Sequence, residues 1–411
     1  MFDRQSLKIP EILDEGRFMM SHFPTFNGRH LAAIALALTA LTISACTSNA
    51  ASNTSASSNG MPERPAASPT PTYLFTKVDD PSGTNNNVTG INDNNQIVGV
   101  YYGSAPAQYN SYFSTPSATG TYAGFNTANF PDSHKESSKS QIGGTYIRSI
   151  STTVTSPIID AGYAYNPGGL QGSGYGTETG VWGVANNEGL WSIQKLHSGE
   201  RGTLCIDTVL NGINHKGYAV GAYANSTASC SLRAFYDQPG EGNFDLSPVS
   251  APLISEGTGI NDSCDVVGWL QVSAKSKEEG FYGAPSQQGS HQGCATAKMT
   301  YTYTAPLTYQ SSGDSTQPLG INSSNPPQIV GSFTVGTGKS AVTHGFVLTI
   351  AASGSQSWQS IDDPKAQTLT VVSGINDNGV ICGWYDDSNG NLHGFVASPV
   401  SIHTIRRRRT R

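Results

Sequence analysis

Three pairs of adjacent aspartates are the residues of this sequence best suited to chemistry. They are Asp79-Asp80, Asp362-Asp363 and Asp386-Asp387. Closely spaced carboxylates can serve as acid and base in glycoside hydrolysis, or bind calcium through their oxygens. The first two pairs each precede a proline at equivalent places of a repeat, which favours a role in a turn.

The last pair opens the segment DDSNGN at 386–391, which has some features of a calcium loop. It lacks the distal glutamate of such loops, and a polar hairpin turn explains it as well. We therefore predict no cofactor and no metal ligand, with calcium at this segment as the alternative.

Two histidines, His344 and His393, occupy one point of the same repeat, each within His-Gly-Phe. They would either line a common funnel or form hydrogen bonds within their own repeat units. Because only two units keep the histidine, the second interpretation is favoured.

Motifs of common enzymes are absent. The sequence has no Gly-x-Ser-x-Gly, no His-Glu-x-x-His, no Cys-x-x-Cys and no phosphate-binding loop. Their absence argues against the common hydrolases and zinc enzymes. A repeat enzyme that draws one residue from each unit would leave no local motif, so catalysis stays open, but we predict no catalytic residue.

The elements that would position these residues come from an internal repeat. Its anchor is Gly-Ile-Asn, followed by a short turn and an apolar segment with a central glycine, such as QIVGVY (96–101) or VICGWY (380–385). The recurring glycines and asparagines are Gly90, Asn92, Gly212, Asn214, Gly259, Asn261, Gly320, Asn322, Gly374 and Asn376. We assign them a structural role in the repeat.

The spacing of the anchors predicts one hidden unit. The first two anchors are 122 residues apart, whereas the later gaps are 47, 61 and 54. QIGGTY at 141–146 is similar to QIVGVY at 96–101, and we interpret it as the glycine-centred strand of a unit without its anchor. Six units then fill 73–399.

Each unit reads as four short strands. We expect a strand through Val/Ile-Asp-Asp-Pro, the anchor strand, a hairpin turn with Gly217 or Gly379 at positive φ, the glycine-centred strand and an aromatic strand. A glycine inside a strand indicates that a backbone or ring approaches closely. Apolar residues on both faces of the strand predict a sheet covered on both sides.

Repeated four-stranded sheets of this size predict an all-β β-propeller, with six blades of about four antiparallel strands. A solenoid and a two-sheet sandwich are the alternatives. In a closed ring, 73–116 and 358–399 would be neighbours although they lie far apart in sequence. The composition agrees, because only 13% of residues are charged while 46 are glycine, which suits turns rather than helices.

The repeat resembles the HAF-type extracellular repeat family of bacteria. The resemblance is clearest at 374–383 with His393-Gly394-Phe395, and partial at 320–331 and 90–99. It covers most of 73–399 and implies an exported, propeller-like surface protein. The family brings no catalytic residues to carry over.

The first 45 residues resemble the signal peptide of a bacterial lipoprotein. An apolar run of 13 residues, Leu31 to Ile43, ends in Ser44-Ala45-Cys46. It is too short to span a bilayer but suits a secretory segment. The resemblance implies cleavage before Cys46 and lipid on its sulfur, with translation starting at Met19 or Met20. Thr47 in place of aspartate implies the outer membrane.

The segments that flank the repeat read as flexible. Residues 46–72 are rich in Ser, Ala, Asn and Pro and predict a tether, and 400–411 form a basic tail. Residues 46–405 hold 25 acidic and 14 basic residues, which argues against a nucleic-acid partner.

An exported protein favours disulfides. The candidates are Cys205 with Cys230, and Cys264 with Cys294, the second pair tying one unit to the next. Cys382 stands where other units have valine, and we expect a buried free thiol.

The preferred functional prediction is a lipid-anchored propeller of the cell envelope that binds a surface polymer or a protein and catalyses nothing. A glycoside hydrolase or polysaccharide lyase on the same fold is the alternative. A purely structural envelope lipoprotein is the second alternative. The chain is rich in Tyr and Trp. Their rings would suit a carbohydrate ligand if they were exposed, but packing between blades explains most of these residues better.

Overall fold

The computed structural model describes most of the repeat region. The described residues are 72–102, 109–128, 144–151, 159–166, 177–184, 208–225, 231–238, 242–250, 252–286, 294, 299–309 and 315–400. They belong to one compact unit, Ala67–Arg411. The predicted signal peptide, Cys46 and the basic tail lie outside the described residues. No helix within the described ranges is long and apolar enough to cross a membrane.

Within the described residues, the fold consists of strands β1 to β23 and a short 3-10 turn, η2 (Gly338–Ser340). The second sheet in chain order holds β9 (Thr208–Ile213), β10 (Ala219–Asn225), β11 (Ser231–Gln238) and β12 (Gly242–Asp245). The third holds β13 (Ile254–Ile260), β14 (Val266–Gln271), β15 (Glu279–Pro285) and β16 (Tyr301–Leu307). The fourth holds β17 (Ser315–Ile321), β18 (Gln328–Val335), β19 (Val342–Ile350) and β20 (Gln356–Ile361).

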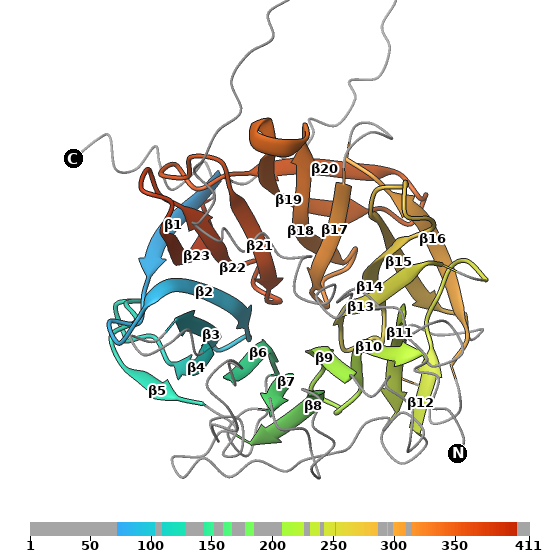
Figure 1. The fold of residues 1–411 in the computed structure, drawn as a ribbon, viewed down its shortest axis with the longest axis horizontal. Coiled ribbons are helices and arrows are strands. Elements are labelled where there is room, and N and C mark those ends of the chain that lie inside the picture. The colour runs from blue at the N-terminus through green and yellow to red at the C-terminus, as the bar shows by residue number, and fades with distance from the viewer. Residues whose placement is uncertain are drawn as a thin grey trace, which may run out of the picture. The chain divides into compact units, whose positions relative to one another are not determined.

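The last sheet joins both ends of the repeat region. It holds β21 (Thr370–Ile375), β22 (Ile381–Asp386), β23 (Leu392–Val400) and β1 (Thr72–Val78). β1 pairs with β23 from Thr72 opposite Val400 to Val78 opposite Gly394. The predicted closure, with the two ends as neighbours, is confirmed (Figure 1).

This pairing corrects the predicted order of strands in a unit. The Val/Ile-Asp-Asp-Pro segments were expected to open each unit. Instead, β1 and β20 are the outer strands of the sheets that hold β23 and β19. The sequence motif thus marks the passage from one sheet to the next.

The first sheet has seven strands: β2 (Thr84–Ile91), β3 (Ile97–Tyr102), β4 (Tyr109–Ser114), β5 (Phe125–Thr127), β6 (Gly144–Ile150), β7 (Ile159–Asn166) and β8 (Thr177–Val184). The prediction of six separate blades is therefore wrong in its count, because the described residues form five sheets. The cause is local. β5 pairs only with Tyr112–Ser114 of β4. The first residue of β4, Tyr109, is therefore left to pair in parallel with Gly144 of β6.

The hidden unit is also placed differently from the prediction. Residues 144–146 of QIGGTY belong to β6, an inner strand, and not to a glycine-centred strand. Ser149-Ile150-Ser151 stands where other units have Gly-Ile-Asn. The glycine-centred strand is β7, in which Gly162 faces Ile147 as Gly99 faces Val88. Two substitutions within three residues conceal the anchor.

The hairpin between the inner and second strands follows the predicted turn chemistry. In the last sheet the Asn376 N–H donates to the Val380 carbonyl at 3.0 Å, and the Gly379 N–H donates to the Asn376 carbonyl at 3.0 Å. Gly379 has φ 73° and Gly217 has φ 82°. Glycine adopts this backbone conformation without the steric cost that a Cβ brings.

The glycine inside each second strand is required by close packing. A Cβ on Gly383 would lie 1.9 Å from the Val371 carbonyl oxygen and 2.9 Å from the Phe395 ring. Gly268 stands in the same relation to the Glu256 carbonyl and the Phe281 ring. The expected close approach of a backbone and a ring is confirmed.

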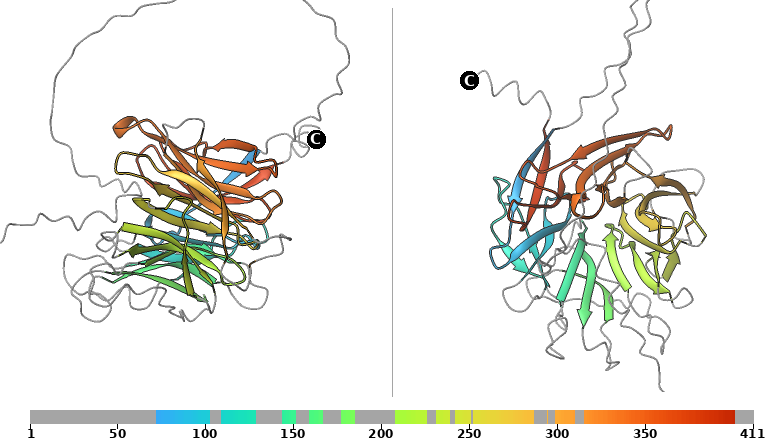
Figure 2. Two further views of the ribbon diagram at one scale, coloured as in Figure 1. Left: turned by 90° about the vertical axis from the view of Figure 1, so that its right-hand side faces the viewer. Right: turned by 45° about the horizontal axis from the view of Figure 1, so that its top comes forward.

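The sheets pack face to face (Figure 2). Apolar side chains fill the space between them. One cluster joins Val220 and Tyr236 of one sheet to Val266 and Phe281 of the next. Another joins β2–β4 to Cys382 and Val396 of the last sheet. Four-stranded antiparallel sheets that bury both faces against neighbours in a closed order form a β-propeller.

Candidate functional site

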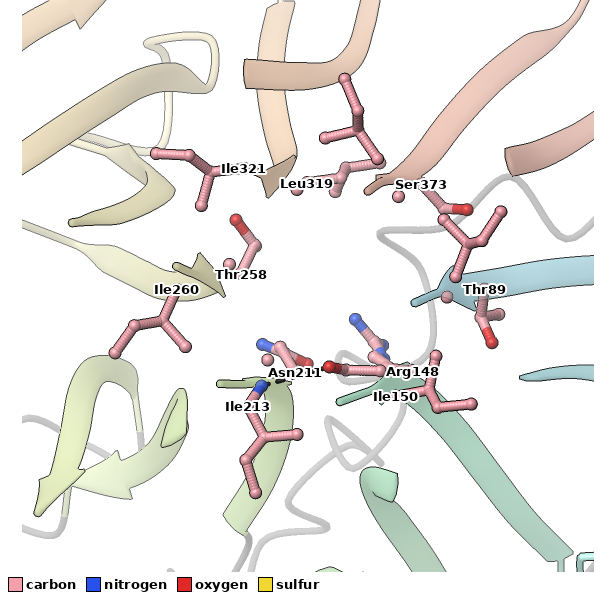
Figure 3. A pocket seen from close by; sticks show the side chains of 18 residues that line it. Thr89, Arg148, Ile150, Asn211, Ile213, Thr258, Ile260, Leu319, Ile321 and Ser373 are labelled. Carbon is pink, nitrogen blue, oxygen red and sulfur yellow. Dashed lines mark hydrogen bonds between the residues drawn. The ribbon is translucent and has the colours of Figure 1, made fainter. Parts of the chain in front are cut away.

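An axial cavity of about 90 Å³ lies among the described residues. Three consecutive residues from each of six inner strands, β2, β6, β9, β13, β17 and β21, line it (Figure 3). The middle one of the three is the anchor glycine, or Ser149 in β6. The residues before it, here called the pre-glycine residues, are Thr89, Arg148, Asn211, Thr258, Leu319 and Ser373.

The anchor glycines let neighbouring inner strands approach each other closely. A Cβ on Gly212 would lie 3.1 Å from the Gly259 Cα. The same contact is 3.1 Å from Gly259 to Gly320 and 3.2 Å from Gly320 to Gly374. Gly90 would meet the Ser149 Cα at 3.0 Å. A larger residue would force the inner strands apart.

The anchor asparagines link the sheets through a ring of hydrogen bonds. Each is 2–4% exposed, and each side-chain Nδ2 donates to the backbone carbonyl at the equivalent position after the next inner strand. The bonds run from Asn214 to Asn261 (3.0 Å), Asn261 to Asn322 (3.0 Å), Asn322 to Asn376 (3.1 Å), Asn376 to Asn92 (2.9 Å) and Asn92 to Ser151 (3.3 Å). The Oδ1 of each asparagine closes its own turn, as in Asn214, which accepts from the N–H groups of Lys216 and Tyr218.

The described bonds of this ring have one gap. Ser151 holds the asparagine place of β6, and its short hydroxyl has no hydrogen-bond partner. A different hydrogen bond links β6 to β9, because the Ile213 N–H donates to the Ser149 hydroxyl at 3.1 Å.

The pre-glycine residues reinforce the same contacts between sheets. The hydroxyls of Thr89, Thr258 and Ser373 donate to carbonyls of the adjacent inner strand at 2.6, 2.7 and 2.7 Å. The Asn211 Nδ2 donates to the Gly257 carbonyl at 2.9 Å. Arg148 and Leu319 depart from this pattern, and Arg148 projects into the opening in Figure 3.

Aspartates beside the anchor turns form a further series of contacts between neighbouring sheets. The Asp377 N–H donates to Asp93 Oδ1 at 2.8 Å, and the Ser323 N–H donates to Asp377 Oδ1 at 2.6 Å. Burial raises the pKa of Asp377, and the charges of Asp93 and Asp262 raise this pKa further, against hydrogen bonds from Ser323. His215 pairs with Asp262 across another pair of sheets.

The histidines of the repeat pair with the first aspartate of each Asp-Asp-Pro. His393 Nδ1 lies 2.8 Å from Asp79 Oδ2, and its Nε2 lies 3.3 Å from Asp387 Oδ2. His344 Nδ1 lies 3.0 Å from Asp362 Oδ2. Each histidine therefore holds the outer strand of its own sheet and does not face a shared funnel.

The remaining aspartates of the three pairs close turns. Asp80 Oδ1 accepts from the Ser82 N–H, and Asp363 Oδ1 accepts from the Lys365 N–H, both at 2.8 Å. This agrees with the turn role favoured from the sequence.

Asp386 and Asp387 are also held by hydrogen bonds. Asp386 accepts from the N–H groups of 367–369 and from the Thr368 hydroxyl at 2.6 Å. Burial raises the pKa of Asp386, but the bonds from Thr368 and its neighbours outweigh burial, and the net shift is downward. Hydrogen bonds from Asn391 and Asn389 lower the pKa of Asp387. The described residues include no group of three or more His, Cys, Asp or Glu suited to a metal ion.

The predicted disulfide between Cys264 and Cys294 is present. It ties the β13–β14 turn to the segment between β15 and β16, within one sheet and not between units as expected. Cys382 is a buried free cysteine, as predicted. Cys205 and Cys230 lie outside the described residues.

The aromatic side chains of the glycine-centred strands are buried where the structure describes them, except for the half-buried Tyr102 and Tyr223. Trp269 and Trp384 are each 4% exposed, and Tyr385 is 2% exposed. They pack in the fold, as the sequence favoured, and offer no exposed platform for a sugar ring.

No protein-family model and no curated protein matches this chain. Solved structures do match. AofleA from Arthrobotrys oligospora is 9% identical with a TM-score of 0.43, over 80% of this chain and 90% of that one. The six-bladed fucose-recognising lectin of Aleuria aurantia is 10% identical with a TM-score of 0.40, over 76% of this chain and 91% of that one. Trypanosoma rangeli sialidase, solved with the inhibitor DANA, is 10% identical with a TM-score of 0.43, over 77% of this chain and 55% of that one. Similarities this low extend neither a ligand nor an activity to this chain.

Proposed function

We propose that the chain is an exported, lipid-anchored propeller of the HAF-repeat type that binds a surface polymer or a protein partner and catalyses no reaction. One observation supports the absence of catalysis in this proposal. The aspartates and histidines that recur in the repeat, from Asp79 to His393, hold turns and outer strands, and none of them is among the residues that line the axial cavity. A catalytic acid and base must lie together within reach of one substrate.

The seven-stranded sheet acts as two blades in this proposal, which gives six. Its halves, β2–β5 and β6–β8, are joined by a single pair of β-bridged residues together with side-chain hydrogen bonds, and each contributes one inner strand to the cavity. Hydrogen exchange tests this, because two independent blades would exchange the Tyr109 and Gly144 amides faster than amides inside either half. Equally slow exchange at this junction would contradict the six-blade count.

The membrane anchor rests on the Ile43-Ser44-Ala45-Cys46 motif. Cells expressing the full chain with a labelled fatty acid should yield labelled protein in the envelope fraction. Cys46→Ser should abolish the label and release the chain, with Cys382→Ala as the matched control. Label that persists in Cys46→Ser would reject the anchor.

Binding is tested on the full chain in detergent micelles, by thermal shift with bacterial and plant polysaccharides and with envelope extracts. A ligand of the folded state raises the unfolding midpoint. We expect a shift with one polymer or partner and recovery of that polymer unchanged. Shortened or unsaturated products would instead support a hydrolase or lyase. The absence of any shift would support a structural role.

A further inference from the structure

The strand that closes the ring is held by a histidine that lies between two carboxylates. His393 of β23 is half-buried, with 18% of its side chain exposed. Its Nδ1 lies 2.8 Å from Oδ2 of Asp79, just after β1, and its Nε2 lies 3.3 Å from Oδ2 of Asp387, in the turn between β22 and β23. One imidazole ring thus joins β1 to this turn, beside the paired strands β1 and β23 (Figure 1).

Both contacts at once require the doubly protonated ring. A neutral imidazole has one N–H donor and one nitrogen with a lone pair, whereas both nitrogens donate in the imidazolium form. In the neutral ring, one nitrogen would therefore set its lone pair against a carboxylate oxygen. Histidine is the side chain that ordinarily changes its charge between about pH 5 and 8. The geometry around His393 couples the two contacts to one proton.

The two carboxylates are fixed by bonds of their own. Asp79 Oδ1 accepts from the Gly394 N–H at 3.2 Å, and its Oδ2 pairs with Lys77 Nζ at 2.8 Å. Asp387 Oδ1 accepts from two backbone N–H groups of its own turn at 2.8 and 2.9 Å, which leaves Oδ2 toward the ring. The hydrogen bonds from Asn391 and its neighbours lower the pKa of Asp387, so this carboxyl stays ionised.

The other charged groups around the ring favour one further positive charge. Burial raises the pKa of Asp363, before β21, while Lys365 and the charge of His393 lower it in part. Tyr385 of β22 lies 5.4 Å from the His393 ring, and burial raises the pKa of Tyr385 to about 12, so this phenol stays neutral. β2, which packs against β23 from the neighbouring sheet, has no charged residue. Three carboxylates and two lysines thus surround His393, and the imidazolium form balances their charges.

A second histidine at the same place of the repeat provides the comparison. Within the described residues, His344 pairs with a carboxylate through Nδ1 alone, at 3.0 Å from Asp362 Oδ2. Val335 stands where the last sheet has Asp387, two residues after the strand residue that faces the histidine. A neutral imidazole satisfies this single contact with its one N–H. Among the histidines that the structure describes, His393 alone contacts two carboxylates.

We propose that His393 is a proton-dependent latch, which holds β1 to the 387–391 turn when it is protonated and loosens β1 from β23 when it loses its proton. Because the protonated ring makes both contacts only in the folded chain, this stabilisation is present at acid pH and is lost as the pH rises. The strand so released is the one that follows the predicted tether and closes the ring. The latch does not depend on the proposed binding function.

Hydrogen exchange of the full chain, followed by mass spectrometry and corrected for the intrinsic rate at each pH, measures the opening of β1. Between about pH 5.5 and 8.5 we expect the protection of the amides in Thr72–Val78 to fall about tenfold, because a charge-assisted hydrogen bond is lost. The outer strand β20, beside which His344 uses one nitrogen, should keep its protection. Equal protection of β1 at both pH values, or an equal fall in β20, would overturn the proposal.

Asp387→Asn removes the second carboxylate without opening the turn, since its amide oxygen still accepts from the backbone and its amide nitrogen donates to a neutral ring. We expect the protection of β1 in this variant to agree within about twofold at both pH values. Asp362→Asn, at the other histidine, is the matched control and should leave the fall in β1 unchanged. A tenfold fall that persists in Asp387→Asn would show that the second contact is not the latch.

The protonation of the ring is read directly from the ¹⁵N resonances of the His393 imidazole, assigned by their loss in His393→Gln. We expect both nitrogens to carry a proton at the lower pH and one of them to lose it within the range in which β1 loosens. A ring with a single protonated nitrogen at every pH of this range would contradict the latch, even if β1 loosened.

Discussion

Removing one anchor asparagine should destabilise the whole ring of sheets. Asn261 is 4% exposed and makes four side-chain hydrogen bonds. Two of them, from the N–H groups of Ser263 and Asp265, close its turn, and one reaches the Asn322 carbonyl of the next sheet at 3.0 Å. Each net bond contributes ~1 kcal/mol, and a buried group left unpaired costs ~1–3 kcal/mol. We therefore expect Asn261→Ala to lower the free energy of unfolding by about 4 kcal/mol.

Asn261→Asp separates the two roles of this side chain. It keeps the acceptor for the turn but places a second oxygen against the Asn322 carbonyl, so we expect a comparable loss. Asn389→Ala is the matched control, because this exposed turn residue offers only a 3.5 Å side-chain contact to Asp387. Urea unfolding followed by fluorescence and circular dichroism together measures all three variants and checks whether unfolding is two-state. If Asn261→Ala unfolds at the same urea concentration as Asn389→Ala, the ring of asparagines does not hold the sheets together.

Three further predictions follow from the same contacts. Ser151→Asn should fill the gap in the asparagine ring and raise the free energy of unfolding by ~1 kcal/mol, the contribution of one net hydrogen bond, in the same urea assay. A free energy of unfolding below that of the unchanged chain would show that this position cannot accommodate asparagine. Replacing both Cys264 and Cys294 with serine opens a loop of sequence separation 30 and should cost about 3.5 kcal/mol by calorimetry, whereas Cys382→Ala leaves that loop closed. Asp386 has its pKa lowered in the folded state, so it contributes stability that is present above its unfolded pKa, near 4, and is lost as the pH falls below it. Asp386→Asn should therefore flatten the fall in stability below pH 4 in urea titrations, and an unchanged acid limb would contradict the assignment.

The strand pattern and the closure of the ring could be predicted because the same packing contacts recur from unit to unit. Gly-Ile-Asn recurs since a Cβ at Gly259 would meet the next backbone, and since the Asn261 amide reaches the next carbonyl. These constraints act at every unit and so leave a visible period in the sequence.

The sheet count and the hidden unit could not be predicted, because they depend on non-repeating contacts. Nothing local in Tyr109 or Gly144 indicates the single pair that merges two units into one sheet. Ser149 links β6 to β9 by a different hydrogen bond, which it accepts from the Ile213 N–H, while the Ser151 hydroxyl has no partner. The anchor therefore disappears from the sequence. Five inner strands share the pattern x-Gly-Ile. Aligning Ser149-Ile150 with Gly-Ile would have placed Arg148 at the cavity from the sequence alone.

The sequence assigned Asp-Asp-Pro to the wrong end of a unit, because the motif lies between two sheets along the chain. A motif at the junction of two sheets belongs equally to the end of one unit and the start of the next in sequence. Only the pairing of β1 with β23 and of β20 with β19 decides between them. The histidine contacts follow from that pairing, since His393 reaches Asp79 only because β1 lies beside β23.

The most direct test of binding without catalysis incubates the full chain with a polysaccharide fraction prepared from bacterial envelopes. Size-exclusion chromatography with light scattering then measures the bound fraction and the polymer length together. The account predicts saturable binding to a polymer whose length stays unchanged over days. A polymer that becomes shorter in proportion to protein concentration and time would contradict it.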